Sequence, residues 1–178
     1  YELTQRGECN FDQGGYFIIN GSEKVIVAQE RISNNHVYVF RKKQPSKYEW
    51  VCETRSHIST GARPTSTMYF QMYGKGPDGS IDSHQIRCVL PYIRTDIPVV
   101  IVFRALGFTA DRDIIEHIVY DTADFEMMER FRPSLQEASP IQNQIVALDF
   151  IAVRGSPSVS SVGRQDRVKH AREILQKE

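Results

Sequence analysis

Histidine, cysteine and carboxylate side chains are the groups of this sequence most able to do chemistry, and their spacing matches no familiar catalytic arrangement. Glu116-His117 lacks the second histidine that would complete a metal-binding helix face. The sequence also lacks the Gly-x-Ser-x-Gly turn of serine hydrolases and the phosphate-binding loop of nucleotide hydrolases. We therefore expect no catalytic residue in this chain.

Four acidic residues in one short segment could be drawn as a magnesium site, but a solvated acidic helix face is the favoured interpretation. Magnesium is usually held by one or two protein carboxylates together with a phosphate substrate, and this segment implies no pocket. We therefore predict no metal site and no cofactor in this chain. The four residues are Asp121, Asp124, Glu126 and Glu129.

The three cysteines, Cys9, Cys52 and Cys88, are odd in number, lie far apart and include no Cys-x-x-Cys pair. A zinc site or a disulfide framework is therefore not expected, and buried or half-buried thiols in a reducing compartment are the preferred interpretation. One alternative is an unrecognised hydrolase that uses Cys52 or Cys88 with a histidine. Such an enzyme needs a pocket that the sequence does not announce.

The formal net charge is zero, from 22 basic and 22 acidic residues, which is unlike an autonomous nucleic-acid-binding domain. The charge is nevertheless unevenly placed. Residues 31–63 hold seven basic and two acidic side chains, whereas residues 111–137 hold three basic and eight acidic ones. We expect two faces of opposite sign, one suited to DNA and one to a basic partner protein; solvated faces without a partner are the alternative.

The elements that must position these residues begin with strands and turns. Residues 16–19 are apolar, Asn20-Gly21 is typical of a two-residue hairpin turn, and residues 25–27 are predicted to supply the returning strand. Glycine and proline at residues 74–79 predict an exposed hairpin loop. Further strands, rich in β-branched and aromatic residues, are predicted at residues 36–41, 48–55, 67–73 and 85–90.

Helices follow in the C-terminal half. Residues 99–106 are apolar almost all round, which predicts burial; Asp96 could cap this helix, Pro98 suits its first turn, and Gly107 ends it. On periodicity alone, residues 99–102 could equally be a buried strand. The order of elements predicts an α+β fold in which an antiparallel strand meander precedes a packed helical half. Further helices are predicted at residues 111–119, 122–131, 141–153 and 164–176, with a mobile loop at 156–163.

Several longer stretches carry a resemblance to a known family. They are RGEC at 6–9, GGYFIINGSEKVIVAQER at 14–31, RPTST at 63–67, LPYIRTDIPVVIVFRALGF at 90–108, DRDIIEHI at 111–118, ALDFI at 147–151 and AREILQKE at 171–178. In these stretches the chain closely resembles the second-largest subunit of multi-subunit RNA polymerases, and among the nuclear enzymes it is most similar to polymerase II. Residues 48–59 and 156–163 depart from the pattern expected of any one member. The sequence starts without methionine and its last helix lacks a stop residue, so we expect a fragment.

The resemblance implies a specific place in the polymerase. Residues 1–30 would be a strand pair of the subunit's protrusion, and residues 31–178 would be the lobe, which walls the cleft for downstream DNA. Implied partners are the other polymerase subunits, DNA, the RNA–DNA hybrid and the initiation factor TFIIF, in the nucleus. The family holds its catalytic magnesium mainly on the largest subunit, so this segment should be catalytically silent within a nucleotidyltransferase. The sequence shows no apolar run of bilayer length, and we expect no membrane partner.

The resemblance also singles out seven residues near nucleic acid. Lys24 would approach a phosphate of the RNA–DNA hybrid, with Gln29 and Arg31 nearby; these contacts would fix position without reading sequence. The alternatives are an exposed cross-strand charge pair between Glu23 and Lys24, and a nearby carboxylate for Arg31. The residues that could lie over downstream DNA are Arg41, Lys42, Lys43 and Arg63.

Strand geometry limits which of these side chains can act together. Adjacent residues of a strand point to opposite faces, so residues 41–43 cannot all reach one groove of DNA. The strand aromatics suit core packing better than base stacking. The aromatics are Tyr48, Trp50, Tyr69, Phe70 and Tyr73.

The rival function is a free-standing adaptor that binds proteins through its acidic helices, without any polymerase.

Overall fold

The computed structural model describes residues 2–43, 45–74, 84–155 and 163–176. The chain divides into two compact units, residues 1–33 and 34–178, and each is described by itself. The resemblance implied a boundary three residues earlier, after residue 30. Most of the predicted loop at residues 156–163 and most of the one at 74–79 lie outside the described residues.

The N-terminal unit holds a short helix and a hairpin. Helix α1 is Glu2–Gln5, strand β1 is Phe17–Ile19 and strand β2 is Ser22–Lys24. The turn between the strands is the predicted one: Asn20 and Gly21 have φ of 51° and 76°, the left-handed pair that a type I′ turn requires. The hairpin signature in the sequence is thereby confirmed.

The returning strand is not where the sequence placed it. Ser22 pairs with Ile19 directly after the turn, so β2 is complete at Lys24, and residues 25–27 are exposed and outside any strand. In this register residues 26 and 27 would have to pair with Gly15 and Gly14, whose φ values of 82° and 69° are not those of a strand. The prediction followed β-branched composition and missed the glycines opposite.

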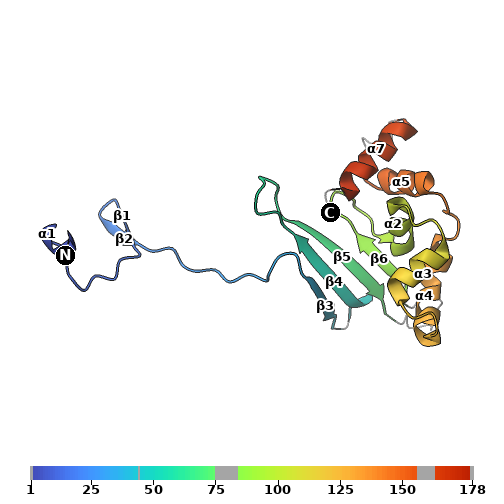
Figure 1. The fold of residues 1–178 in the computed structure, drawn as a ribbon, viewed down its shortest axis with the longest axis horizontal. Helices are drawn as coiled ribbons and strands as arrows, with labels where there is room; N and C mark the ends of the chain where they lie inside the picture. Colours follow the sequence, from blue (N-terminus) through green and yellow to red (C-terminus); the bar gives the residue numbers. More distant parts are fainter. Residues whose placement is uncertain (1, 44, 75–83, 156–162, 177–178) are drawn as a thin grey trace. The chain divides into compact units, whose positions relative to one another are not determined.

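The C-terminal unit contains a five-stranded antiparallel sheet whose strands pair in chain order (Figure 1). The first four strands of the sheet confirm the predicted meander, with ends within one residue of those expected, whereas the short fifth strand was not predicted. The strands are β3 Val37–Arg41, β4 Tyr48–Ser56, β5 Ser66–Tyr73, β6 Ile86–Val89 and β7 Ile97–Pro98.

Helices cover one face of the sheet at β5, β6 and β7, whereas β3 at the opposite edge is mostly exposed. Phe70, Cys88 and Ile97 are register partners on β5, β6 and β7, so they share a face. Cys88 and Ile97 are fully buried, and Phe70 packs against the same cluster. The helices gather on this side of the sheet in Figure 1. The unit is therefore α+β, as the sequence predicted.

The first helix of the layer, α2, spans Val99–Leu106 and is buried over most of its surface. Gly107 ends it with φ of 116°, as predicted. The predicted cap is wrong: Asp96 precedes β7, Pro98 occupies the cap position, and no side chain caps the helix. The Asp96 carboxylate instead accepts a hydrogen bond from the hydroxyl of Tyr73 at 3.2 Å.

The remaining helices are those predicted, with three boundaries shifted by three or more residues: both ends of α4 and the start of α5. Helix α4 starts late because the Asp124 side chain accepts the amide proton of Met127 at 3.0 Å, and it continues past Pro133 because Ser134 and Ala138 are fully buried. Helix α5 starts where Asn143 caps the amide of Ile145. The helices are α3 Asp111–Val119, α4 Phe125–Ala138, α5 Gln144–Val153 and α7 Arg164–Leu175.

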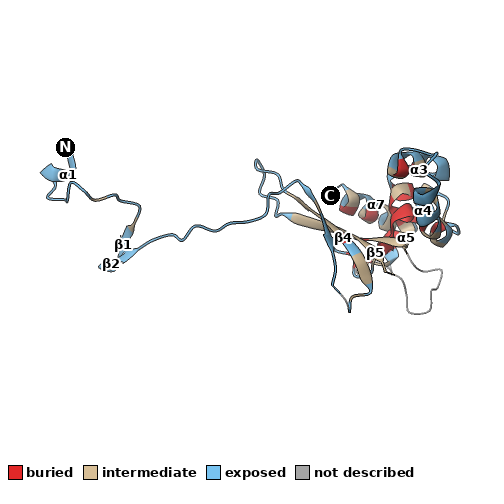
Figure 2. Ribbon diagram, turned by 90° about the horizontal axis from the view of Figure 1, so that it is seen from below, coloured by how far each residue is buried: buried red, intermediate tan, exposed pale blue. Residues whose placement is uncertain are grey.

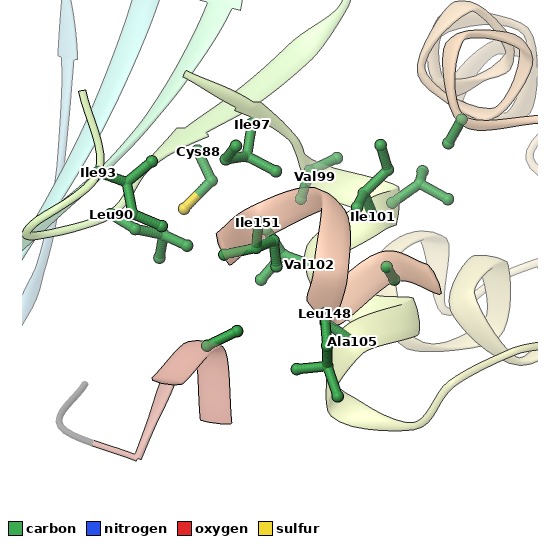
Figure 3. Close-up of a cluster of buried hydrophobic side chains, with 14 of the residues drawn as sticks. Cys88, Leu90, Ile93, Ile97, Val99, Ile101, Val102, Ala105, Leu148 and Ile151 are labelled. Atoms are coloured by element: carbon green, nitrogen blue, oxygen red, sulfur yellow. The ribbon is translucent and has the colours of Figure 1, made fainter. Parts of the chain in front are cut away.

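The core is centred on α2. Figure 3 shows Val102 of α2 together with Leu148 and Ile151 of α5 in one apolar cluster that reaches Cys88 on β6. Helix α7 adds Ala171 and Ile174, which are fully or almost fully buried. Residues from β6, α2, α5 and α7, which are distant in sequence, thus form one core.

One polar side chain enters this core. Arg104 of α2 is 1% exposed. Its guanidinium donates to the backbone carbonyls of Ala138 and Ile141 and pairs with Asp111. The contact to Ala138 is 2.6 Å. Arg104 therefore ties the end of α4 and the segment before α5 to the start of α3.

Candidate nucleic-acid and partner surfaces

Lys24 ends strand β2 and is exposed. Its cross-strand partner is Phe17, and the partner of Glu23 is Ile18. Glu23 and Lys24 therefore alternate to opposite sides of the hairpin, and the suggested charge pair between them is wrong. Within the described part of the chain, no carboxylate lies in ion-pair range of Lys24. Its ammonium group is free to meet an anion.

Gln29 and Arg31 lie on the extended segment that follows β2, and both are exposed. Neither belongs to a helix or strand. They share the N-terminal unit with Lys24, whereas Arg41, Lys42, Lys43 and Arg63 belong to the C-terminal unit. The seven candidate residues are therefore split into two groups on separate units.

Side-chain hydrogen bonds to Asp12 stabilise the segment just before strand β1. The Tyr16 hydroxyl donates to the Asp12 carboxylate. This bond raises the pKa of Tyr16 to about 12 and lowers the pKa of Asp12. The Gly14 amide also donates to Asp12, at 2.9 Å. The half-buried Asp12 thus fixes the residues just before β1.

Arg41 ends the edge strand β3 and is only partly available. Its guanidinium lies 3.2 Å from Glu49 and 5.7 Å from the centre of the Trp50 ring. Lys42 continues the pairing, since its amide donates to the Glu49 carbonyl at 2.8 Å, and the side chains of Lys42 and Lys43 are exposed. Among the described residues, this end of the β3–β4 hairpin offers two exposed cations, Lys42 and Lys43, and two engaged ones, Arg41 and Lys47.

Arg63 lies at the other end of the same hairpin. It lines a hollow of about 270 Å³ together with Asn35, Ser56 and His57, where β3 begins and β4 ends. The length of β3, about 15 Å, separates it from Arg41. The four cations assigned to downstream DNA therefore do not form one patch.

The strand aromatics are engaged in cross-strand contacts. The rings of Tyr48 and Tyr73 lie 5.1 Å apart, and the Lys47 ammonium lies over both, 4.6 Å and 5.6 Å from their centres. A hydrogen bond to Tyr48 raises the pKa of Lys47, and burial raises the pKa of Tyr73. Tyr48 and Tyr73 thus form a cross-strand pair and Phe70 packs against the core, as predicted, whereas Trp50 is 38% exposed.

The four carboxylates of the acidic segment already have partners close by in the chain. Asp121 accepts the amide proton of Ala123 at 2.8 Å, and Asp124 caps α4. Glu126 pairs with Arg130, and Glu129 with Arg132. Over residues 2–43, 45–74, 84–155 and 163–176, no three histidine, cysteine or acidic side chains converge as metal ligands.

The three thiols have different environments. Cys88 is fully buried, Cys52 is half-buried, and Cys9 is exposed, so the prediction of a buried thiol is wrong for Cys9. Burial raises the pKa of Cys52, with a further contribution from Glu53. A nucleophilic thiol needs the opposite shift, which argues against the hydrolase alternative.

Thiol labelling should follow this order of burial. With a thiol-specific alkylating reagent at neutral pH, we expect Cys9 to react first, Cys52 slowly and Cys88 only on unfolding. Peptide mass spectrometry after timed quenching measures each rate. The same reaction in denaturant, where all three should react alike, is the control. Faster labelling of Cys52 than of Cys9 would restore the hydrolase alternative.

Sequence reasoning missed two clusters. Arg87 of β6 joins Asp96 to Glu137 of α4, residues that are far apart in the chain. A groove between α5 and α7 is lined by three basic residues among six. The spacing of Arg164, Val168 and Arg172 along one helix side could have indicated the groove. Nothing local could have indicated the Arg87 cluster.

Across the described residues, no helix is both long and apolar enough to span a bilayer.

Comparison with known proteins gives consistent matches. A family model described as RNA polymerase Rpb2, domain 2, matches residues 33–178. The chain is 59% identical over 178 residues to DNA-directed RNA polymerase II subunit 2 of Arabidopsis thaliana, covering 99% of this chain and 15% of that protein.

More distant relatives match over a similar length. DNA-directed RNA polymerase II subunit RPB2 of Schizosaccharomyces pombe is 51% identical over 177 residues, and subunit Rpo2 of Saccharolobus solfataricus is 35% identical over 176 residues. Each match covers 99% of this chain and 14% of the relative. The chain thus spans about one seventh of the length of these proteins.

Proposed function

Because the chain belongs to the RNA polymerase Rpb2 domain 2 family, we propose that it forms the lobe, with an adjoining strand pair of the protrusion, in the second-largest subunit of RNA polymerase II. The proposal assigns residues 31–178 to the lobe and residues 1–30 to the strand pair. The observation that carries it is the 59% identity over the whole chain to a polymerase II subunit. The free-standing adaptor has no such support, since the relatives are polymerase subunits.

The exposed apolar surface of the N-terminal unit supports a place within a larger assembly. Ile18, Ile26 and Val27 are 61%, 80% and 78% exposed, and none of the described residues of this unit is buried (Figure 2). A three-residue hairpin without a core cannot hold its shape alone. We propose that another part of the subunit covers it.

In this role the chain acts by position and charge. Lys24, with Gln29 and Arg31, would contact the phosphates of the RNA–DNA hybrid, and the cations of the β3–β4 hairpin would attract downstream DNA. These contacts hold nucleic acid without selecting a sequence. The segment contributes no catalytic group, and the magnesium of nucleotidyl transfer would be bound elsewhere in the enzyme.

The proposed partners follow from the same assignment. They are the other polymerase subunits, DNA and the RNA–DNA hybrid in the cleft, and the initiation factor TFIIF on the outer face of the helical layer. The nucleus is the proposed compartment. The acidic excess of residues 111–137 suits a basic surface of a partner protein.

Binding across a salt series tests the nucleic-acid part. We expect the chain to bind short duplex DNA and an RNA–DNA hybrid weakly at low salt, measured by fluorescence anisotropy, and not at physiological salt, because only a few phosphates are contacted. Lys24→Glu should weaken hybrid binding, and Lys42→Glu with Lys43→Glu should weaken duplex binding. Each lost phosphate contact should lower the salt slope by about one.

Arg130→Gln is the matched control, since Arg130 already pairs with Glu126 and should leave both affinities unchanged. Tight, salt-resistant or sequence-selective binding would contradict the cleft-wall proposal and make this an autonomous nucleic-acid domain.

A further inference from the structure

The helical layer carries a hollow between α5 and α7 that the contacts proposed for nucleic acid do not use. Its volume is about 450 Å³. One lining residue comes from α5 and five come from one side of α7, which neighbours α5 in Figure 1. The lining residues are Ile145, Arg164, Gln165, Val168, Lys169 and Arg172. We call this hollow the α5–α7 groove.

The centre of the α5–α7 groove is apolar. Val168 is half-buried and packs against the core, so its position is fixed. Ile145, near the start of α5, is 48% exposed. A side chain placed between Ile145 and Val168 would remove apolar surface of both from water.

The rim of the groove is positively charged. Arg164, Lys169 and Arg172 are exposed, and none pairs with a carboxylate in the described part of the chain. Arg167 lies on the same helix and is instead held by Asp149, at 2.6 Å. The structure thus neutralises the cation that packs against α5 and leaves the rim cations available.

We infer that the α5–α7 groove binds an acidic linear segment of a partner protein. An apolar side chain of the segment would lie between Ile145 and Val168, and carboxylates on either side would pair with the rim cations. Such a segment is complementary to the groove, because its apolar side chain matches the apolar centre and its carboxylates match the basic rim. The inference rests on the proposed role as a factor-docking surface and adds a second docking site, basic in character and separate from the acidic residues 111–137.

Nucleic acid is the less fitting occupant. A phosphate backbone gains nothing from Ile145 and Val168, and the exposed Asp166 and Glu173 on the same helix would repel it. An acidic peptide gains from the apolar contact and can place its carboxylates away from these two residues. The observations therefore favour a protein segment.

Binding of designed peptides tests the inference. The probe is a short fluorescent peptide with a central Leu-Phe pair flanked by aspartate and glutamate, titrated with the chain. Lys169→Glu with Arg172→Glu should weaken binding roughly tenfold, because each exposed ion pair becomes a repulsion. Ile145→Ala should weaken it about threefold through lost apolar contact. Circular dichroism confirms that each variant is folded.

Matched controls separate this inference from the nucleic-acid proposal. Lys42→Glu with Lys43→Glu makes the same change in charge on the sheet and should leave peptide affinity unchanged while weakening duplex DNA binding. A peptide with the same acidic residues but serine in place of Leu-Phe should bind less tightly and should not respond to Ile145→Ala.

Two results would overturn the inference. One is peptide affinity that the Lys169 and Arg172 reversals do not change. The other is a loss of duplex DNA binding in that variant with peptide binding intact, which would make the groove a nucleic-acid surface. If Lys42→Glu with Lys43→Glu does not weaken duplex DNA binding in the salt series, only the cleft-wall proposal is contradicted.

Discussion

Replacing Arg104 with alanine is expected to destabilise the C-terminal unit by about 3–5 kcal/mol, because two backbone carbonyls lose their donor at about 1–3 kcal/mol each and a buried side chain leaves a cavity. The carbonyls belong to Ala138 and Ile141. A loss of this size is a large part of the stability of an ordinary domain. Urea unfolding followed by circular dichroism measures it as a lower midpoint.

Two further variants give this prediction its control. Arg112→Ala removes an arginine whose side chain is 86% exposed and pairs with Glu116 on the same helix, and it should leave the midpoint unchanged. Arg104→Lys keeps the charge but cannot reach both carbonyls and the Asp111 carboxylate, so it should fall between the wild type and the alanine variant. Wild-type stability in Arg104→Ala would mean that the carbonyls find other donors.

Replacing Arg87 with alanine is expected to cost about 2–4 kcal/mol, because it leaves two carboxylates half-buried without their shared cation. The side chains of Arg87, Asp96 and Glu137 are only 25%, 23% and 18% exposed. Arg87 also lies over the ring of Tyr73, 5.5 Å from its centre, and the Tyr73 hydroxyl donates to Asp96. The loss should appear in urea unfolding as a lower midpoint.

A double-mutant cycle tests whether the interaction is the cause. Arg87→Met combined with Glu137→Leu should be less destabilised than the sum of the single variants, with a coupling of about 1–3 kcal/mol. The matched surface pair, Arg130 and Glu126, should show a coupling below about 0.5 kcal/mol. Strict additivity at Arg87 and Glu137 would show that the variants act through packing alone.

Sequence patterns predicted most of the secondary structure because those patterns depend on contacts within one turn or one hairpin. The Asn20-Gly21 turn needs only the left-handed backbone of two residues. The α2 boundaries follow from an apolar run that Gly107 ends. Where local rules competed, prediction failed: residues 25–27 have the composition of a strand, but the glycines opposite them cannot pair.

The candidate site was only partly predictable. The family resemblance singled out Lys24 on the predicted hairpin, and residue type identified 41–43 as a basic run. Type could not reveal that Glu49 and Trp50 engage Arg41, or that Arg63 lies at the opposite end of the hairpin. Those facts depend on strand register, which pairs residues that the local pattern treats as unrelated.

The sequence by itself determined the α+β order, the Asn20-Gly21 hairpin, the buried α2 helix and, through collinear motifs, the polymerase family. Only the tertiary structure decided the roles of the polar residues. Arg104 meets Ile141 across 37 positions and Arg87 meets Glu137 across 50, and the α5–α7 groove exists only where two helices pack. Periodicity reports which side of an element is apolar, whereas the partner of a buried charge is set by elements that fold onto it from elsewhere in the chain.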